Sequence, residues 1–187
     1  KQIDFTFEYG GRTWSVDDYM KAYKVSGVLV IRDGKVLLER YAMGRRPEDR
    51  WTSFSVAKSV TSTLVGAAIQ DGKIKGLSAP VTDYIPELKG SGYDGVTVRQ
   101  LLMMSSGVKW NEDYADPNSD VAKSTTMTVE PGVNPLVRYM SRLPRENAPG
   151  TKFNYNTGET DLVGIMVSNA VGKSLSAYAS EKLWKPY

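Results

Sequence analysis

Apolar runs early in the chain, separated by a turn signal, predict one β-hairpin. Two runs rich in β-branched and apolar residues, 25–32 and 35–41, flank the dipeptide Asp33-Gly34. Asp and Gly tolerate the positive φ angles of a tight turn, so this spacing is typical of two antiparallel strands joined by two residues. Because an isolated hairpin is marginally stable in water, other strands are expected to complete its sheet.

Helical periodicity begins after the hairpin. Between residues 56 and 70, apolar and small residues including Gly66 recur at helical spacing, and Asp71-Gly72 ends the run. This pattern predicts a buried helix that packs closely through its small residues. Further helices are predicted from Thr97 through Met104 to a stop at Gly107, from Asn134-Pro135, from the residues after Tyr155 to Gly172, and after Ser174 or Ser176.

Composition limits the chemistry more than it limits the fold. The 187 residues include neither histidine nor cysteine. A Ser-His-Asp triad, a Cys-His nucleophile, a histidine-ligated zinc site and a disulfide framework are therefore excluded within these residues. Acid–base catalysis would have to use Lys, Tyr, Asp or Glu side chains.

Charge and hydropathy indicate whether the chain would bind nucleic acid or span a membrane. The 24 basic and 21 acidic residues give a net charge of +3 without a basic face, so nucleic acid is not expected as a partner. No apolar run approaches the ~20 residues of a membrane span, and none is predicted.

Ser-x-x-Lys is the simplest way to activate a serine without histidine. At the start of a helix, a serine and a lysine three residues later share one face, and a desolvated lysine can take the hydroxyl proton. Ser55 and Lys58 occur at the predicted start of the most apolar helix. Ser106 and Lys109 instead span a predicted helix end, so they would not share a face. Taken alone, the pattern is more simply that of a plain N-cap at Ser55 with a solvated lysine one turn on.

Tyr155 is the second candidate, on a short segment between the turn at 148–151 and a helix. A phenol serves as a general base or acid if a nearby ammonium stabilises its phenolate. Taken alone, it is more simply a tyrosine whose hydroxyl forms a hydrogen bond, because the chain contains 11 tyrosines.

Three ordered segments together resemble a known superfamily. They are 51–58 (WTSFSVAK), 96–107 (VTVRQLLMMSSG) and 149–157 (PGTKFNYNT). In order and spacing they are similar to the serine β-lactamases and penicillin-binding proteins, and most of all to the class C-related branch of carboxylesterases, D-aminopeptidases and 6-aminohexanoate-dimer hydrolases. The resemblance extends from about Val25 to the last residue. Three motifs in the expected order are far more specific than the Ser-x-x-Lys motif alone.

The resemblance implies roles for individual residues. Ser55 would be the acylated nucleophile, Lys58 its general base and Tyr155 the tyrosine of the Tyr-x-Asn motif. Thr157 replaces the usual amide of that motif, which makes lactam specificity less expected, and it is expected together with Tyr114 to bind substrate. Tyr114 is equally well read as an aromatic residue that packs its own loop. The implied mechanism needs no cofactor or metal.

The resemblance also implies a fold and a partner. It predicts an α+β, β-lactamase/transpeptidase-like fold whose helical domain packs on an antiparallel sheet, with about two strands from this chain. Residues 1–187 would be the N-terminal part of one catalytic unit, with the sheet hairpin at 24–42 and a mostly helical region at 51–187. Nothing after Tyr155 matches the family's Lys/His-Thr/Ser-Gly-like strand. A second polypeptide with the C-terminal half is therefore expected.

The expected activity is that of a serine hydrolase on a small ester or amide, through an acyl-enzyme on Ser55. Two alternatives stay open, namely a DD-peptidase or β-lactamase, and a non-catalytic binding module that keeps the fold. Fold-level likeness does not choose among substrates.

Overall fold

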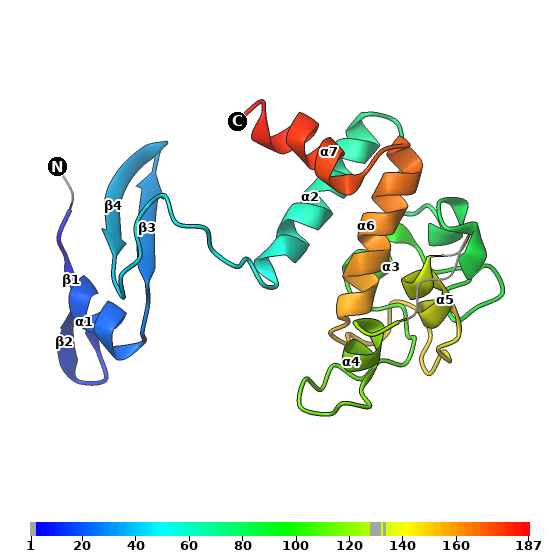
Figure 1. Cartoon of the computed structure of the whole chain (residues 1–187), viewed down its shortest axis with the longest axis horizontal. Coiled ribbons are helices and arrows are strands. Elements are labelled where there is room, and N and C mark those ends of the chain that lie inside the picture. The colour runs from blue at the N-terminus through cyan, green and yellow to red at the C-terminus, as the bar shows by residue number, and fades with distance from the viewer. Residues whose placement is uncertain (1–2, 128–131, 133) are drawn as a thin grey trace. The chain divides into compact units, whose positions relative to one another are not determined.

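The protein is described as a computed structural model, in which residues 3–127, 132 and 134–187 are described. The chain divides into two compact units, Lys1–Thr52 and Ser53–Tyr187 (Figure 1). The strands lie in the first unit and the second is helical. This distribution agrees with the predicted α+β class.

The predicted hairpin is present in the first unit. Strands β3 (Gly27–Arg32) and β4 (Lys35–Tyr41) pair antiparallel, with Arg32 opposite Lys35 and one irregularity between Val30 and Ile31. The turn residues Asp33 and Gly34 have φ angles of 51° and 70°. Both values are left-handed, as a two-residue turn of this kind requires.

A second hairpin and a short helix in this unit were not predicted. Strands β1 (Thr6–Tyr9) and β2 (Arg12–Ser15) form their own two-stranded sheet, and helix α1 (Val16–Ala22) follows directly. A capping box between Ser15 and Asp18 starts α1. Val16 and Met20 of α1 are buried together with Leu38 of β4, so the helix supplies most of a small core.

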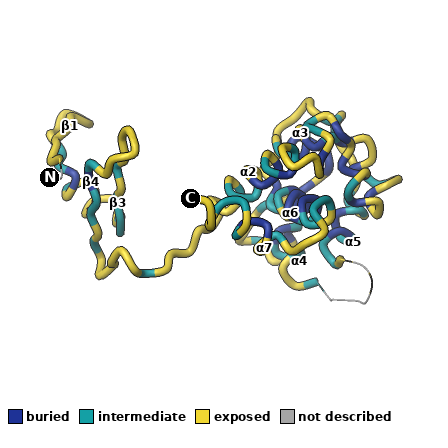
Figure 2. Tube along the Cα trace, turned by 90° about the horizontal axis from the view of Figure 1, so that it is seen from above, coloured by how far each residue is buried: buried dark blue, intermediate teal, exposed yellow. Residues whose placement is uncertain are grey.

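The second unit is built around helix α6 (Thr157–Val171). Helix α2 (Val56–Gln70) packs along α6, and the buried residues of this unit gather around α6 in Figure 2. The other helical elements are α3 (Val98–Leu102), α4 (Asp120–Ser124), α5 (Pro135–Ser141), α7 (Leu175–Ala179), η1 (Val81–Asp83), η2 (Pro86–Leu88) and η3 (Ser180–Trp184). Among the described residues, no helix is long and apolar enough to cross a membrane.

Helix α2 has the predicted bounds but not the predicted burial. Only one side of it enters the core, through Leu64, Val65 and Ala68. Within residues 53–187, a Cβ built on Gly66 would meet no described side chain or neighbouring element within 4 Å. Close packing through Gly66 is therefore not made inside this unit and stays a prediction, because periodicity reports where apolar residues recur and not which elements cover them.

The ends of the remaining helices follow local capping chemistry. Thr97 caps α3 as predicted, but the helix ends at Leu102 and not near Gly107, since Met104 already has a φ of 49°. Asn134 caps α5 and Ser174 caps α7, which decides between the two predicted serines. Gly172 ends α6 in the left-handed conformation.

Candidate active site

Ser55 lies at the entrance of α2. Phe54 before it has a φ of 44°, whereas Ser55 has the helical φ and ψ angles −69° and −6°. A positive φ at a bulky residue is uncommon and marks a sharp turn into the helix. Within the described chain, the Ser55 side chain caps no backbone N–H of α2. The hydroxyl is thus available to other side chains.

Two other predicted residues meet at Ser55 Oγ. Lys58, one helical turn on, donates from Nζ to this oxygen over 3.1 Å. Tyr155 donates its hydroxyl to the same oxygen over 2.9 Å. Lys58 Nζ also lies 5.2 Å from the centre of the Tyr155 ring, within cation–π range. The structure therefore brings Ser55, Lys58 and Tyr155 together, although Tyr155 lies far from the other two in sequence.

These contacts make Tyr155 more acidic. The hydrogen bond with Ser55 lowers the pKa of the Tyr155 phenol below its usual 10.0; partial desolvation opposes this effect, and the hydrogen bond and charge of Lys58 add to it. Hydrogen bonds that Ser55 and Lys58 donate to the phenolate oxygen, together with the positive charge of Lys58, favour the phenolate over the neutral phenol. A phenol with a lowered pKa exchanges protons more readily near neutral pH.

The segment that carries Tyr155 is irregular, and contacts on both sides hold it. Asn154 N donates to the Met104 carbonyl over 2.9 Å, and Asn156 N donates to Met104 Sδ over 3.4 Å. Asn154 Nδ2 donates to the Trp110 carbonyl over 3.2 Å. The position of Tyr155 thus depends on the chain between α3 and α4.

Glu112, which the sequence analysis did not single out, connects the 110–120 loop to α6. It accepts hydrogen bonds from Thr157 N over 3.0 Å and from the Tyr114 hydroxyl over 2.6 Å. Thr157 Oγ1 and Trp110 Nε1 donate to it as well. Burial raises the pKa of Glu112, but these hydrogen bonds outweigh burial and the pKa is lowered. Its loop contains several acids, so no sequence signal distinguished Glu112.

Tyr114 and Thr157 are neighbours, as their predicted shared role requires. Their hydroxyl oxygens are 3.5 Å apart. Tyr114 is 72% exposed, and its hydrogen bond to Glu112 raises the pKa of the phenol. The charge of Lys58 acts on Tyr114 in the opposite direction, which places Tyr114 within electrostatic range of Lys58.

The second Ser-x-x-Lys pair has a different environment. Ser106 is 1% exposed, accepts from Val108 N over 3.0 Å and donates to Glu159. Lys109 Nζ forms an ion pair with Glu146 over 3.3 Å at the surface. Ser106 and Lys109 therefore serve separate structural contacts, as expected for a pair that lies outside a helix.

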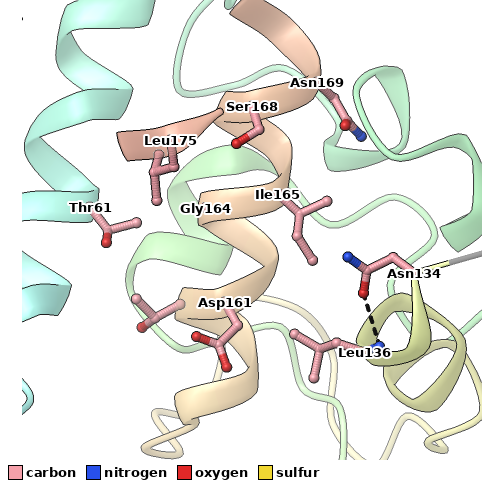
Figure 3. A pocket seen from close by; sticks show the side chains of 10 residues that line it. Thr61, Asn134, Leu136, Asp161, Gly164, Ile165, Ser168, Asn169 and Leu175 are labelled. Carbon is pink, nitrogen blue, oxygen red and sulfur yellow. Dashed lines mark hydrogen bonds between the residues drawn. The ribbon is translucent and has the colours of Figure 1, made fainter. Parts of the chain in front are cut away.

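A groove of about 460 Å³ lies beside α6 (Figure 3). Figure 3 shows Asp161 of α6 and Asn134 at the start of α5 among its lining side chains. The surrounding protein desolvates the Asp161 carboxylate and raises its pKa, while the charge of Lys58 opposes this shift. Asp161 is thus electrostatically linked to the cluster at Ser55.

Comparisons with known proteins place these residues in a family context. A family model described as Beta-lactamase matches residues 15–187. The chain is 38% identical over 160 residues to a 6-aminohexanoate-dimer hydrolase of Paenarthrobacter ureafaciens, a match that covers 83% of this chain and 41% of that protein. The chain thus spans less than half the length of this relative.

Solved structures show the same fold. A Bacillus anthracis structure assigned by name to the 6-aminohexanoate-dimer hydrolases superposes with a TM-score of 0.78 at 23% identity, covering 97% of this chain and 49% of that one. EstCE1, described as a hydrolase with promiscuous acyltransferase activity, gives a TM-score of 0.66 at 19% identity. The match covers 89% of this chain and 49% of EstCE1. At these identities the likeness establishes the fold.

Proposed function

This chain belongs to the beta-lactamase family, and on that premise we propose that it is the N-terminal part of a serine hydrolase that acts on esters or amides. One observation carries the proposal. Lys58 Nζ and the Tyr155 hydroxyl both form a hydrogen bond with Ser55 Oγ, over 3.1 and 2.9 Å. A nucleophile with two proton-exchanging groups in reach is the arrangement that covalent catalysis needs.

The proposed reaction has two steps. Ser55 Oγ attacks the substrate carbonyl carbon, and its proton passes to neutral Lys58 or to the Tyr155 phenolate. The resulting tetrahedral intermediate expels the alcohol or amine, which takes that proton, and leaves an acyl group on Ser55. Water then attacks the acyl carbonyl, gives up a proton to the same groups, and releases the acid and free Ser55.

The entrance of α2 contributes electrostatically. The aligned N–H groups at the start of this 15-residue helix favour negative charge at its N-terminus. We propose the backbone N–H of Ser55 as one donor to the oxyanion of the intermediate. The second donor would come from the strand that the family resemblance implies beyond these residues.

Tyr114 and Thr157 are proposed to bind substrate. Glu112 holds both hydroxyls, so their positions are set as a pair beside the Ser55 cluster. Thr157 at the position of an amide weakens the case for lactam substrates. The name of the 38% identical relative supports a linear amide of the 6-aminohexanoate type as the first substrate to try.

We further propose that activity needs a complementing polypeptide. The chain spans 41% of its relative and 49% of a solved neighbour, and Gly66 of α2 faces open space within residues 53–187. The missing half of the family fold would cover such a face. This partner would carry the remaining sheet strands and the second oxyanion donor.

Covalent labelling tests the proposal. The chain, mixed with the C-terminal half of its relative, is treated with a fluorophosphonate and analysed by intact mass and peptide mapping. Modification is expected at Ser55 and should disappear in Ser55→Ala, whereas the matched control Ser59→Ala, an exposed serine on the same helix, should label as the wild type does. Unchanged labelling of Ser55→Ala would overturn the assignment.

The same assembly distinguishes the alternatives. Turnover of p-nitrophenyl acetate or of an aminohexanoate dimer supports the esterase or amidase proposal. A long-lived penicillin adduct would instead indicate a DD-peptidase, and penicillin hydrolysis a β-lactamase. Absence of both labelling and turnover in the assembly would indicate a binding module.

A further inference from the structure

Glu159 is a buried acid that the proposed chemistry does not use. It lies in the first turn of α6 and is only 2% exposed. Carboxylates are seldom buried so completely without compensating partners. Here the partners are uncharged: Ser106 Oγ donates to Glu159 Oε1, and Asn156 Nδ2 donates to the same oxygen over 3.4 Å.

The contacts of Glu159 modify an ordinary helix cap. Asn156 caps α6 through a hydrogen bond from Glu159 N to Asn156 Oδ1 of 3.0 Å. In a capping box, the acid at this position would reach back to the cap residue's backbone N–H. That N–H instead donates to Met104 Sδ, and the Glu159 carboxylate binds the Asn156 side-chain amide and Ser106. Both ends of the Asn156 amide are therefore held by Glu159.

This arrangement bears directly on Tyr155, the residue before Asn156. Ser106 receives a hydrogen bond from Val108 N, so Glu159 fastens the start of α6 to the segment 106–108. On the other side of Tyr155, the backbone N–H of Asn154 donates to the Met104 carbonyl. From this geometry we infer that Glu159 is a positioning residue, which holds the Tyr155 hydroxyl at Ser55 Oγ through Asn156.

The environment of Glu159 also gives it an unusual acidity. Burial raises its pKa to about 7, and the hydrogen bond from Ser106 and the neighbouring Tyr93 hydroxyl oppose this shift. Tyr93 is the titratable neighbour among the described residues; its own pKa is raised well above 10.0, first by burial and then by the Glu159 charge. Tyr93 therefore stays neutral while Glu159 changes charge near neutral pH, and the hold on Asn156 should change with it.

This inference rests on the proposed role of Tyr155, so its test needs a readout that does not depend on activity. The chain is labelled with ring-13C tyrosine, and the Tyr155 resonance is assigned by its loss in Tyr155→Phe. Three variants are compared with the wild type. Glu159→Gln keeps the shape of the side chain and an oxygen that accepts hydrogen bonds. Glu159→Leu removes the oxygen that accepts from Ser106 and Asn156. Val167→Ala weakens the packing of the same helix in the core, where Val167 is 0% exposed.

The expected result separates positioning from simple destabilisation. Glu159→Leu should shift the Tyr155 resonance and slow Ser55 labelling in the complemented assembly by about tenfold or more, since misplacement by about 1 Å is costly. Val167→Ala should leave both unchanged despite lower stability. The wild-type resonance should move with a midpoint near pH 7, and Glu159→Gln should abolish that movement.

The contrary result is equally clear. If Glu159→Leu matches Val167→Ala in the Tyr155 resonance and labelling, Glu159 only stabilises the fold and the inference is wrong. If the resonance responds as expected but the wild type itself never labels, the proposed function fails while the positioning role of Glu159 stands.

Discussion

At the scale of single residues, the proposal depends on which groups can exchange a proton with Ser55. Tyr155 offers the shorter of the two hydrogen bonds, and its pKa is lowered by Ser55 and Lys58. Lys58 shares a helix with Ser55, so their distance follows from helical geometry. Tyr155 reaches them only through tertiary structure, which makes its substitution the more informative one.

Tyr155→Phe should reduce acylation of Ser55 by about a hundredfold or more, because general acid–base groups contribute on this scale. Pre-steady-state labelling of the complemented assembly measures the rate. Tyr139→Phe is a matched control, since it removes a phenol that donates to Asp120 and not to Ser55. Equal rates for the two variants would remove Tyr155 from the mechanism.

Glu159 predicts a pH dependence of stability. Its folded pKa is about 7, whereas the unfolded carboxyl titrates near ~4.3. Between these values the unfolded chain loses its proton first, so this contribution to stability is full below about pH 4.3. It falls as pH rises from there to about 7 and is then lost, by about 4 kcal/mol at most. Glu159→Gln should remove this fall. Urea unfolding of both proteins at several pH values between 4 and 8 measures the two pH dependences, and equal dependences would contradict the assignment.

At the scale of single residues, the sequence singled out those candidates that belong to a recognisable motif. Spacing and position at a helix start singled out Ser55 and Lys58, and the order of three segments was needed to give them and Tyr155 their roles. Glu112 and Glu159 escaped because acids are common along the chain, and only the converging donors in the folded structure distinguish them.

At the scale of elements, α2 shows what a periodic pattern leaves open. Its bounds were predicted correctly because Asp71 and Gly72 end it, but residues 53–187 do not cover the side that bears Gly66. The first hairpin was missed although the sequence carries a signal for it. Phe5, Phe7 and Tyr9 alternate with polar residues, and Gly10-Gly11 follows as a two-residue turn.

Gly66→Ala should therefore stabilise this chain. Alanine is favoured over glycine inside a helix by about 0.8–1 kcal/mol, and no described atom lies within 4 Å of the new methyl position. Chemical denaturation of the two proteins measures the gain. Gly158→Ala is the matched contrast on α6, since its Cβ would lie 2.7 Å from Met140 Sδ and Cε and should destabilise. A loss of stability in Gly66→Ala would show that this face of α2 is covered.

At the scale of the whole molecule, the two units have unequal cores. The buried cluster of the second unit draws on residues from Leu64 to Ala179, and none of its buried members lies before Ser53. The first unit buries Val16, Met20 and Leu38, with a few partly buried residues around them. Three motifs were enough to predict the family fold. They could not predict the division into two units with unequal cores, because a motif indicates the chemistry of a site and not how many residues are buried around it.

Because the two cores differ in size, we expect only the second unit to fold as a separate polypeptide. A polypeptide of residues 53–187 should unfold cooperatively, followed by circular dichroism, because its buried cluster is complete without the first unit. Residues 1–52 alone should show no cooperative transition, since a few buried side chains do not offset the loss of chain entropy in so short a segment. If residues 53–187 lack a cooperative transition, their core depends on the first unit. Ser55, Lys58 and Tyr155 all lie within 53–187, so in that case their arrangement would depend on it as well.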